Sequence, residues 1–354
     1  MSNQPQFYDG TKILSMKDLD GNTPEIIMVT SNRNAGKTTY FNRYVFNRWV
    51  KYKEKFVILV RFGYEMDDIH DRFFKDIREL FFPTLTMTSK GIVYNKFREL
   101  YIYPNGQPEL KECCGYAFAL NDANIIKNYS HLFSDATRCI FDEFQSETNR
   151  YCADEINKFR SVHTSLARGR GKQVKFLPVI MMSNNVSIIN PYYVAMGISS
   201  RLNKNTKFLK GHGFILECSF NESASKANKE SGFNACFLDD TYTKYSAENI
   251  YLNDNSAFVE KMTGRSTYLC TLRYNGIDFA VRSFPYEGIV YCDKNADTSY
   301  PVKLCVTTED HNINYVMLKS NDVLLVRLRY FFSKGCFRFK DLECKECVLS
   351  ALSY

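Results

Sequence analysis

The stretch TSNRNAGKTT, residues 30–39, follows the apolar run EIIMV at residues 25–29 and precedes an amphipathic run at residues 40–52. This order predicts a strand, a tight loop and a helix. A loop that binds phosphate needs backbone N–H groups, the positive end of a helix dipole, a lysine for the outer phosphates and a hydroxyl for Mg²⁺. Because Lys37 and Thr38 supply the last two, the stretch predicts a P-loop nucleotide site. The alternative is a plain helix start with a capping serine or asparagine.

Length and charge limit the possible classes of protein. The chain has 354 residues, which is too long for one ordinary core and predicts two domains. Its formal net charge of +7 favours a polyanionic partner, although the basic residues are scattered. No apolar run approaches the roughly 20 residues of a membrane-spanning helix, and the start of the chain lacks the pattern of a secretion signal. We therefore expect a cytoplasmic protein.

The chain has 12 cysteines, most of them in apolar surroundings, where they pack as small hydrophobic side chains in a reducing compartment. Cys344 and Cys347 have the spacing of metal ligands. No second pair lies near them, so a zinc site is not expected.

The residues after the loop predict a layered α/β domain. Residues 40–52 place apolar side chains at helical spacing, and residues 56–60 form a continuous apolar strand. Such uninterrupted runs are typical of a parallel sheet that helices cover on both faces. A helix is expected at residues 67–82, and a β-rich insertion at residues 84–103.

A second chemical stretch begins with the apolar strand at residues 137–141 and ends in Asp142 and Glu143. Ligands bind at the carboxyl ends of strands in open α/β sheets. If Lys37 and Thr38 bind a triphosphate, Asp142 is placed to orient Mg²⁺ and Glu143 is placed to polarise the attacking water. The simpler alternative is an acidic pair that caps a helix.

A helix predicted at residues 151–166 leads into the basic, glycine-rich loop ARGRGK at residues 167–172. Arg168 in this loop is a candidate for contact with an adjacent subunit's phosphates. The alternatives are DNA-phosphate contact and a solvated turn, and position alone does not separate them.

The buried run at residues 174–182 ends in Ser183 and Asn184. Polar side chains at this strand end can sense a γ-phosphate or start a loop turn. A final strand of the same sheet is expected at residues 214–218.

The composition of the sequence changes after this sheet. Residues 221–232 are poor in apolar side chains and are expected to be a linker or mobile lid. The remainder has the pattern of a β-meander followed by helices, which predicts a separate α+β domain. Its strands are expected at residues 267–274, 277–284 and 288–292, and its helices at residues 322–334 and 340–352.

Taken in order, these segments resemble the genome-packaging ATPases of small podophages, which are compact relatives of terminase large subunits. The likeness spans nearly the whole chain, and its most specific segment is SNNVSIINPYY at residues 183–193, which general P-loop proteins do not share. The other segments that carry it are RNAGKT at 33–38, VR at 60–61, FDEF at 141–144, RGR at 168–170, FVEK at 258–261 and YNG at 274–276.

The resemblance implies an additional-strand, RecA- and terminase-like P-loop ATPase domain at residues 1–220, a linker or lid at 221–251 and a smaller α+β, RNase H-like domain at 252–354. It implies a motor that couples hydrolysis of ATP, with Mg²⁺, to translocation of double-stranded viral DNA into a procapsid. The implied partners are the DNA, the portal and further copies of the chain in a pentameric ring, with a packaging RNA as a further candidate. The implied location is the host cytoplasm, at the portal vertex of the procapsid.

The same resemblance assigns roles residue by residue. The family has a lysine before the acid pair that acts in trans, on the ATP of a neighbouring subunit. Lys127 is the nearest candidate for it, although its spacing differs from that of the family. Arg170 is a second trans-acting candidate. The implied roles are catalysis for Glu143, Arg168 and Lys37; ATP binding for Arg33, Asn34, Ala35, Gly36, Lys37, Thr38 and Thr39; metal binding for Thr38 and Asp142; and coupling of hydrolysis to movement for Ser183 and Asn184.

Two departures from the family pattern matter. Ser31 replaces the first glycine of the loop, which changes no catalytic group. The strand at residues 269–273 lacks the aspartate that two-metal cleavage needs, so nuclease activity is not expected. Turn and capping roles account for the acids that follow, Asp293, Asp297, Glu309 and Asp310.

Besides a non-viral helicase of related fold, two alternatives stay open at this point. One is a terminase whose C-terminal nuclease is active. The other is an ATP-gated assembly or docking protein that performs no processive translocation.

Overall fold

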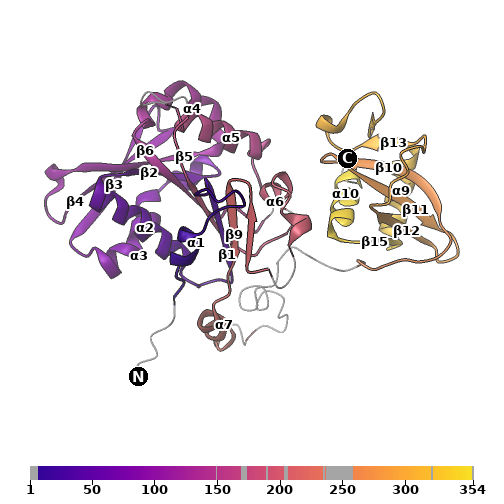
Figure 1. The fold of residues 1–354 in the computed structure, drawn as a ribbon, viewed down its shortest axis with the longest axis horizontal. Coiled ribbons are helices and arrows are strands. Elements are labelled where there is room, and N and C mark those ends of the chain that lie inside the picture. Colours follow the sequence, from indigo (N-terminus) through magenta and orange to yellow (C-terminus); the bar gives the residue numbers. More distant parts are fainter. Residues whose placement is uncertain are drawn as a thin grey trace. The chain divides into compact units, whose positions relative to one another are not determined.

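The structure, a computed structural model, describes residues 7–148, 150–168, 174–188, 190–202, 206–233, 236, 258–319 and 322–352. The chain divides into two compact units, residues 1–253 and 254–354 (Figure 1). Each unit has its own sheet and its own apolar core. Within these described ranges, no helix is long and apolar enough to cross a membrane.

The described part of the first unit contains a nine-stranded sheet in the order β3-β4-β5-β2-β6-β7-β1-β9-β8. Its six central strands run parallel, and antiparallel strands lie at both edges. β7 lies between β1, which precedes the loop, and β6, which ends in the acid pair, as an additional-strand P-loop domain requires. The strands are β1 (Ile26–Ser31), β2 (Lys55–Val60), β3 (Leu85–Ile92), β4 (Phe97–Pro104), β5 (Glu112–Ala119), β6 (Ala136–Asp142), β7 (Val179–Asn184), β8 (Phe208–Gly211) and β9 (Phe214–Cys218).

Helices cover both faces of this sheet (Figure 1). The central strands are therefore buried on both sides. On one face α2 and α3 meet, where the rings of Phe46 and Phe74 lie 4.9 Å apart. On the other face α5 and α6 meet, where the rings of Phe159 and Tyr192 lie 5.6 Å apart. The helices are α1 (Thr11–Ser15), α2 (Lys37–Tyr52), α3 (Ile69–Phe81), α4 (Ala123–Tyr129), α5 (Glu155–Leu166), α6 (Pro191–Ala195) and α7 (Glu222–Lys229).

The elements predicted around the loop are present, with shifts at their ends. The prediction of a buried run from residue 174 is wrong in its first part, because Val174 and Phe176 are exposed and β7 begins only at Val179. The β-rich insertion is the antiparallel hairpin β3–β4, and it joins the main sheet through β5, a strand that the sequence did not predict. The helix expected from residue 151 begins only at Glu155, because Asp154 before it adopts a left-handed backbone conformation with φ of 56°.

A linker or mobile lid was expected at residues 221–232, but Glu222–Lys229 form the helix α7. The side chain of Asn221 caps this helix by accepting the backbone N–H of Ala224 at 2.7 Å. Asn221 also exchanges two hydrogen bonds with Asn32 in the P-loop, at 2.9 and 3.0 Å. Few apolar residues are needed for so short a helix, and its contact with the loop has no signal in the sequence. Residues 234, 235 and 237–251 of the expected linker lie outside the described residues.

The second unit contains, in its described residues, a six-stranded sheet in the order β14-β13-β10-β11-β12-β15. β10, β11 and β12 form an antiparallel meander, and β13 and then β14 add to β10 in parallel. This order, with these directions, is that of an RNase H-like sheet, with β15 added beside β12. The α+β prediction is therefore confirmed. The elements are β10 (Thr267–Tyr274), β11 (Ile277–Phe284), β12 (Ile289–Asp293), β13 (Lys303–Cys305), β14 (Val316–Met317), α9 (Val323–Ser333), β15 (Phe337–Phe339) and α10 (Leu342–Leu352).

Acidic residues of the second unit are engaged in turns and ion pairs. Asp293 pairs with Arg282, and Asp310 accepts hydrogen bonds from Thr307 and from the backbone of Gly276. Asp297 accepts the backbone N–H of Ser299 at 2.8 Å. Cys344 and Cys347 are buried in α10, and the described residues hold no cluster of metal-ligating side chains.

Candidate active site

The loop between β1 and α2 turns sharply because two of its residues adopt left-handed backbone conformations. Asn34 has a φ of 60°, and Gly36, which caps α2, has a φ of 92°. A Cβ atom on Gly36 would also lie 3.3 Å from the ring of Phe7, so glycine suits this position on both counts. The loop therefore directs the chain into the first turn of α2, whose free backbone N–H groups favour an anion.

The remaining loop residues are placed as follows. Ala35 is buried, and its carbonyl accepts the backbone N–H of Tyr8 at 2.9 Å. The amide of Asn34 donates to Asn228 of α7 at 3.1 Å. Thr39 lies in the first turn of α2. The N-terminal segment and α7 thus support the loop from outside.

Lys37 is buried at the start of α2, and its ammonium donates to three neutral oxygens. The partners are the hydroxyl of Ser31 at 2.7 Å, and the carbonyl of Asn32 and the side chain of Asn184 at 3.4 Å each. Burial lowers the pKa of Lys37 to about 8, against the opposing charge of Asp142. A phosphate oxygen is a stronger partner for this ammonium than any of the three neutral oxygens.

The hydroxyl of Thr38 in α2 donates to the carboxylate of Asp142 in β6 at 3.0 Å. The loop and the acid pair, 104 residues apart in sequence, thus meet at one edge of the sheet, as the sequence analysis expected. Burial raises the pKa of Asp142, while the hydrogen bond from Thr38 and the charge of Lys37 act against that rise. A hydroxyl beside a carboxylate is the donor set that P-loop proteins use for Mg²⁺, so these residues fit that ion.

Glu143 follows Asp142 in a left-handed backbone conformation with φ of 55°. Its backbone N–H donates to the carboxylate of Asp142 at 3.0 Å. Desolvation by the surrounding protein raises the pKa of Glu143, and the charges of Asp142 and Glu147 raise it further. A carboxylate with a raised pKa is a better general base near neutral pH than an ordinary one.

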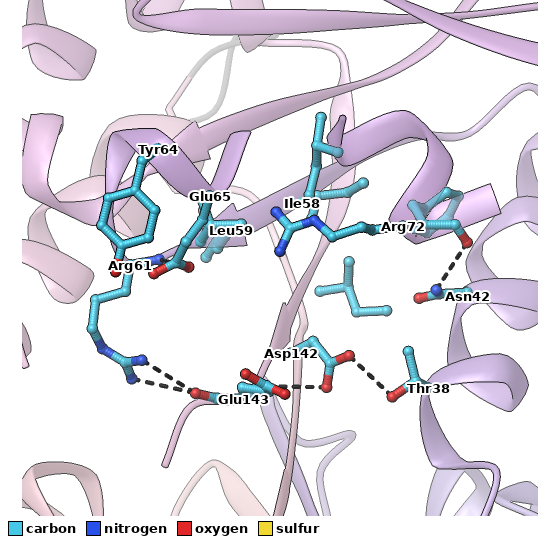
Figure 2. A pocket seen from close by; sticks show the side chains of 14 residues that line it. Thr38, Asn42, Ile58, Leu59, Arg61, Tyr64, Glu65, Arg72, Asp142 and Glu143 are labelled. Atoms are coloured by element: carbon cyan, nitrogen blue, oxygen red, sulfur yellow. Dashed lines mark hydrogen bonds between the residues drawn. The ribbon is translucent and has the colours of Figure 1, made fainter. Parts of the chain in front are cut away.

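A cavity of about 430 Å³ opens beside these groups. Figure 2 shows Thr38, Asp142 and Glu143 along one side of it, with Arg72 of α3 pointing in from the opposite side. The acid pair therefore borders a space that is large enough for phosphate groups and water. Its lining residues are Thr38, Asn42, Ile58, Leu59, Val60, Arg61, Tyr64, Glu65, Ile69, Arg72, Phe73, Ile140, Asp142 and Glu143.

Arg33 in the loop pairs with Glu147, which follows the acid pair in the chain. Asn184 connects to the same carboxylate, because its amide donates to Glu147 at 3.3 Å. Ser183 lies next to Asn184 at the end of β7 and is buried. The two coupling candidates thus lie beside the P-loop, where β7 pairs with β1.

Two of the trans-acting candidates, Arg168 and Lys127, lie apart from this cleft. Arg168 is exposed just beyond α5, and Lys127 is exposed in the last turn of α4. Neither lines the cavity beside the acid pair. Arg170 lies outside the described residues. Exposed positions of this kind suit contact with another subunit, and their roles stay predictions.

Two residues of the site, Glu147 and Arg61, receive no role from the sequence, although Arg61 belongs to the segment VR at 60–61 that carries the resemblance. Glu147, the partner of Arg33, has no signal in the sequence. Arg61 directly follows the buried strand β2, and a charged residue at that place was the available signal. Its side chain is buried and donates to the backbone carbonyls of Glu143 and Phe144.

Comparisons with known proteins agree with this architecture. The chain is 25% identical over 339 residues to the DNA packaging protein of Bacillus phage phi29, which covers 95% of this chain and 93% of the relative. It is 24% identical over 315 residues to the DNA packaging protein of Bacillus phage B103, covering 88% of this chain and 89% of the relative. These similarities extend across both units.

Two solved structures share the fold over nearly the whole chain. The bacteriophage Phi-29 viral genome packaging motor assembly contains a chain with a TM-score of 0.66 and 22% identity, covering 99% of this chain and 98% of that chain. The Phi-28 gp11 DNA packaging motor matches with a TM-score of 0.59 and 16% identity, covering 99% of each chain. The predicted fold class is therefore confirmed.

A family model described as podovirus DNA encapsidation protein (Gp16) matches residues 3–352, which is nearly the full length of the chain. This match confirms the resemblance to podophage packaging ATPases that the sequence motifs indicated. The chain belongs to the podovirus DNA encapsidation protein (Gp16) family.

Proposed function

We propose that this chain is the ATPase of a DNA-packaging motor, which couples hydrolysis of ATP to movement of double-stranded DNA into a procapsid. The observation that carries the proposal is the 3.0 Å contact between Thr38 of the P-loop and Asp142 of the acid pair, in a chain of the DNA encapsidation family. This contact supports a single site for the nucleotide and its metal.

The residues of the cleft divide the chemistry among them. Lys37 exchanges its neutral partners for a phosphate oxygen of ATP, and the backbone N–H groups at the start of α2 bind the phosphates. Thr38 and Asp142 would hold Mg²⁺, which supplies positive charge at the phosphate oxygens when it is bound. Glu143 orients the attacking water and accepts its proton, a role that its raised pKa favours.

A second subunit completes the site in this proposal. Arg168 is exposed beyond α5 and reaches the phosphates bound by a neighbour, where a guanidinium stabilises the charge of the transition state. Lys127 is the alternative trans-acting cation, with Arg170 as a second one. This arrangement requires a closed ring, for which we propose a pentamer.

The partners of the motor follow from the relatives. Relatives of this chain are DNA packaging proteins, and one solved relative is part of a viral genome packaging motor assembly. We accordingly propose that the chain docks at the portal vertex of a procapsid in the host cytoplasm, with a packaging RNA as a further candidate partner. The net charge of +7 suits contact with the phosphates of DNA.

A nuclease function is less well supported. β10 carries no acid, and Asp293, Asp297 and Asp310 are engaged in turns or ion pairs. We therefore assign to the second unit a role in docking or in DNA contact.

The test combines purified protein with procapsids, DNA and ATP. We expect sustained, DNA-stimulated release of phosphate together with protection of DNA from added nuclease, and Glu143→Gln should abolish both. Phosphate release without DNA import would favour an ATP-gated assembly protein. Metal-dependent nicking of plasmid would favour a terminase with an active nuclease.

A further inference from the structure

We propose that Gln145 is a positioning residue that joins the end of the acid strand β6 to the loop after β7, and that this joint passes a change at the bound nucleotide to α6. The inference rests on the proposed function, because it names a residue through which hydrolysis acts on the rest of the motor. Gln145 lies two residues after Glu143 in the chain, and it is 1% exposed.

The side-chain amide of Gln145 binds three groups beyond β7. Its Oε1 atom accepts the backbone N–H groups of Val186 at 3.2 Å and of Ser187 at 2.9 Å. Its Nε2 atom donates to the hydroxyl of Tyr193, in α6, at 3.3 Å. A single side chain from the acid segment therefore holds both the loop after β7 and the helix that follows it.

The loop that Gln145 holds begins beside the nucleotide site. Asn184 is the last residue of β7, and its side chain accepts a hydrogen bond from the ammonium of Lys37 at 3.4 Å. Lys37 is the residue that exchanges its partners for a phosphate oxygen in the proposed function. Val186 and Ser187 lie two and three residues beyond Asn184, so a shift of Asn184 acts directly on the segment that Gln145 holds.

Other contacts make this loop and α6 one unit. The side chain of Asn190 accepts the backbone N–H of Tyr193 at 3.0 Å and donates to the carbonyl of Ser187 at 2.9 Å. The ring of Phe144, the neighbour of Gln145 in the chain, lies 5.9 Å from the ring of Tyr193. The position of α6 therefore depends on the position of the acid segment.

The joint is sensitive to substitution because its partners are buried. Val186 and Ser187 are 1% and 9% exposed, and both backbone N–H groups point at the one oxygen of Gln145. A buried N–H group that loses its acceptor costs more free energy than a hydrogen bond that is merely exchanged for another. Gln145→Leu has a similar volume and leaves both N–H groups unpaired, so we expect the loop to lose its fixed position.

The same substitution should leave the chemistry of the cleft in place. In the part of the chain that the structure describes, the amide of Gln145 hydrogen-bonds only to Val186, Ser187 and Tyr193, and none of these is a proposed ATP or metal ligand. Tyr193→Phe is a milder variant, because it removes one hydrogen bond of the joint and keeps the ring.

Tyr116 offers a matched control for Tyr193. It is a buried tyrosine of β5, and its hydroxyl donates to Asp135 at 2.9 Å and accepts from Lys55 at 3.2 Å. Asp135 and Lys55 lie at the amino ends of β6 and β2, at the opposite edge of the sheet from the acid pair. Tyr116→Phe therefore removes a buried hydroxyl of the same kind and reports the effect of lost stability alone.

The first experiment measures phosphate release and DNA import into procapsids for wild type, Gln145→Leu, Tyr193→Phe and Tyr116→Phe. A loss of stability lowers both quantities together and leaves the ratio of DNA imported to ATP hydrolysed unchanged. We expect Gln145→Leu to release phosphate within about threefold of the wild-type rate and to import about 5- to 30-fold less DNA per ATP. Tyr193→Phe should lower this ratio by about two- to threefold, and Tyr116→Phe should keep the wild-type ratio.

A second experiment needs no DNA import. Hydrogen exchange of the full chain is measured with and without Mg²⁺ and a non-hydrolysable ATP analogue. In the wild type we expect the nucleotide to change exchange both at the start of α2 and at α6. In Gln145→Leu the change at α2 should remain, and the change at α6 should disappear.

An unchanged ratio of DNA to ATP in Gln145→Leu would overturn the proposal, and so would an equal fall of that ratio in Tyr116→Phe. Should Gln145→Leu not fold, the comparison of Tyr193→Phe with Tyr116→Phe decides. If the wild type releases phosphate and imports no DNA, the proposed function fails, and hydrogen exchange alone judges this inference. A nucleotide-dependent change at α6 that persists in Gln145→Leu then contradicts it.

Discussion

The ammonium of Lys37 donates a 2.7 Å hydrogen bond to the hydroxyl of Ser31, the residue that replaces the first glycine of the usual P-loop. The hydroxyl of Ser31 thus accepts a hydrogen bond from Lys37 that the oxygen of a bound phosphate can accept instead. We expect this hydroxyl to compete with ATP for the ammonium.

Ser31→Gly should therefore keep the enzyme active. One hydrogen bond contributes about 0.5–1.5 kcal/mol, so we expect the Kd for ATP to fall by at most about tenfold and kcat to stay within about threefold of wild type. Binding of a fluorescent ATP analogue and release of phosphate measure both quantities, with Lys37→Ala as the inactive control. Loss of ATP binding in Ser31→Gly would show that the hydroxyl is required.

The affinity for ATP should depend on pH through Lys37. Burial lowers the pKa of Lys37 to about 8, and the negative charge of a bound triphosphate raises it again. Below pH 8 the ammonium is already charged, so the Kd should be constant. Above pH 8 binding requires uptake of a proton, so the Kd should rise by up to about tenfold per pH unit. Lys37→Met should show no such rise, and an equal rise in both proteins refutes the assignment.

The main parts of the site were predictable because their signals are local. Gly36-Lys37-Thr38 after one apolar run and Asp142-Glu143 after another predict their own positions, and the carboxyl ends of parallel strands lie at one edge of a sheet. The additional strand β7 followed from the same pattern of apolar runs.

Contacts between distant residues were not predictable. Arg61 and Glu155 are 94 residues apart, and only the pairing of β2 with β6 and the placement of α5 bring them together. Arg33 follows β1 and Glu147 follows β6, and these two residues meet because β7 pairs with both strands. The helix α7 was not predicted because its few buried side chains give no periodic pattern. The contact of its capping residue Asn221 with Asn32 is a hydrogen bond between residues far apart in sequence, which no apolar pattern indicates.

The contact between α7 and the P-loop should stabilise α7 against local unfolding, which can be measured. Asn221 caps α7 and bonds to Asn32, so Asn221→Ala should destabilise this helix by about 0.5–2 kcal/mol. Hydrogen exchange at residues 222–229 measures this change. Asn190→Ala, which removes an equivalent cap from α6, should leave exchange at α7 unchanged. Equal protection of α7 in wild type and Asn221→Ala would exclude this role of the cap.

The trans role of Arg168 predicts complementation between two inactive proteins. Arg168→Ala should lower kcat by about 10³- to 10⁵-fold in assembled rings, as loss of an arginine finger does elsewhere. Mixed rings of Arg168→Ala and Glu143→Gln subunits should regain hydrolysis, because an intact Glu143 then meets an intact Arg168 across some of the seams. If every mixture stays as inactive as its parents, Arg168 does not act on a neighbour.

The central claim is that the P-loop and the acid pair form one site for ATP and its metal. A double-mutant cycle on Thr38→Val and Asp142→Asn tests it most directly, with the affinity for Mg·ATP measured by titration calorimetry. Since both side chains serve the same ion, each single variant should weaken Mg²⁺-dependent binding, and the double variant should be little weaker than either one. Effects that add in full, or binding that stays unchanged in the single variants, would contradict the claim.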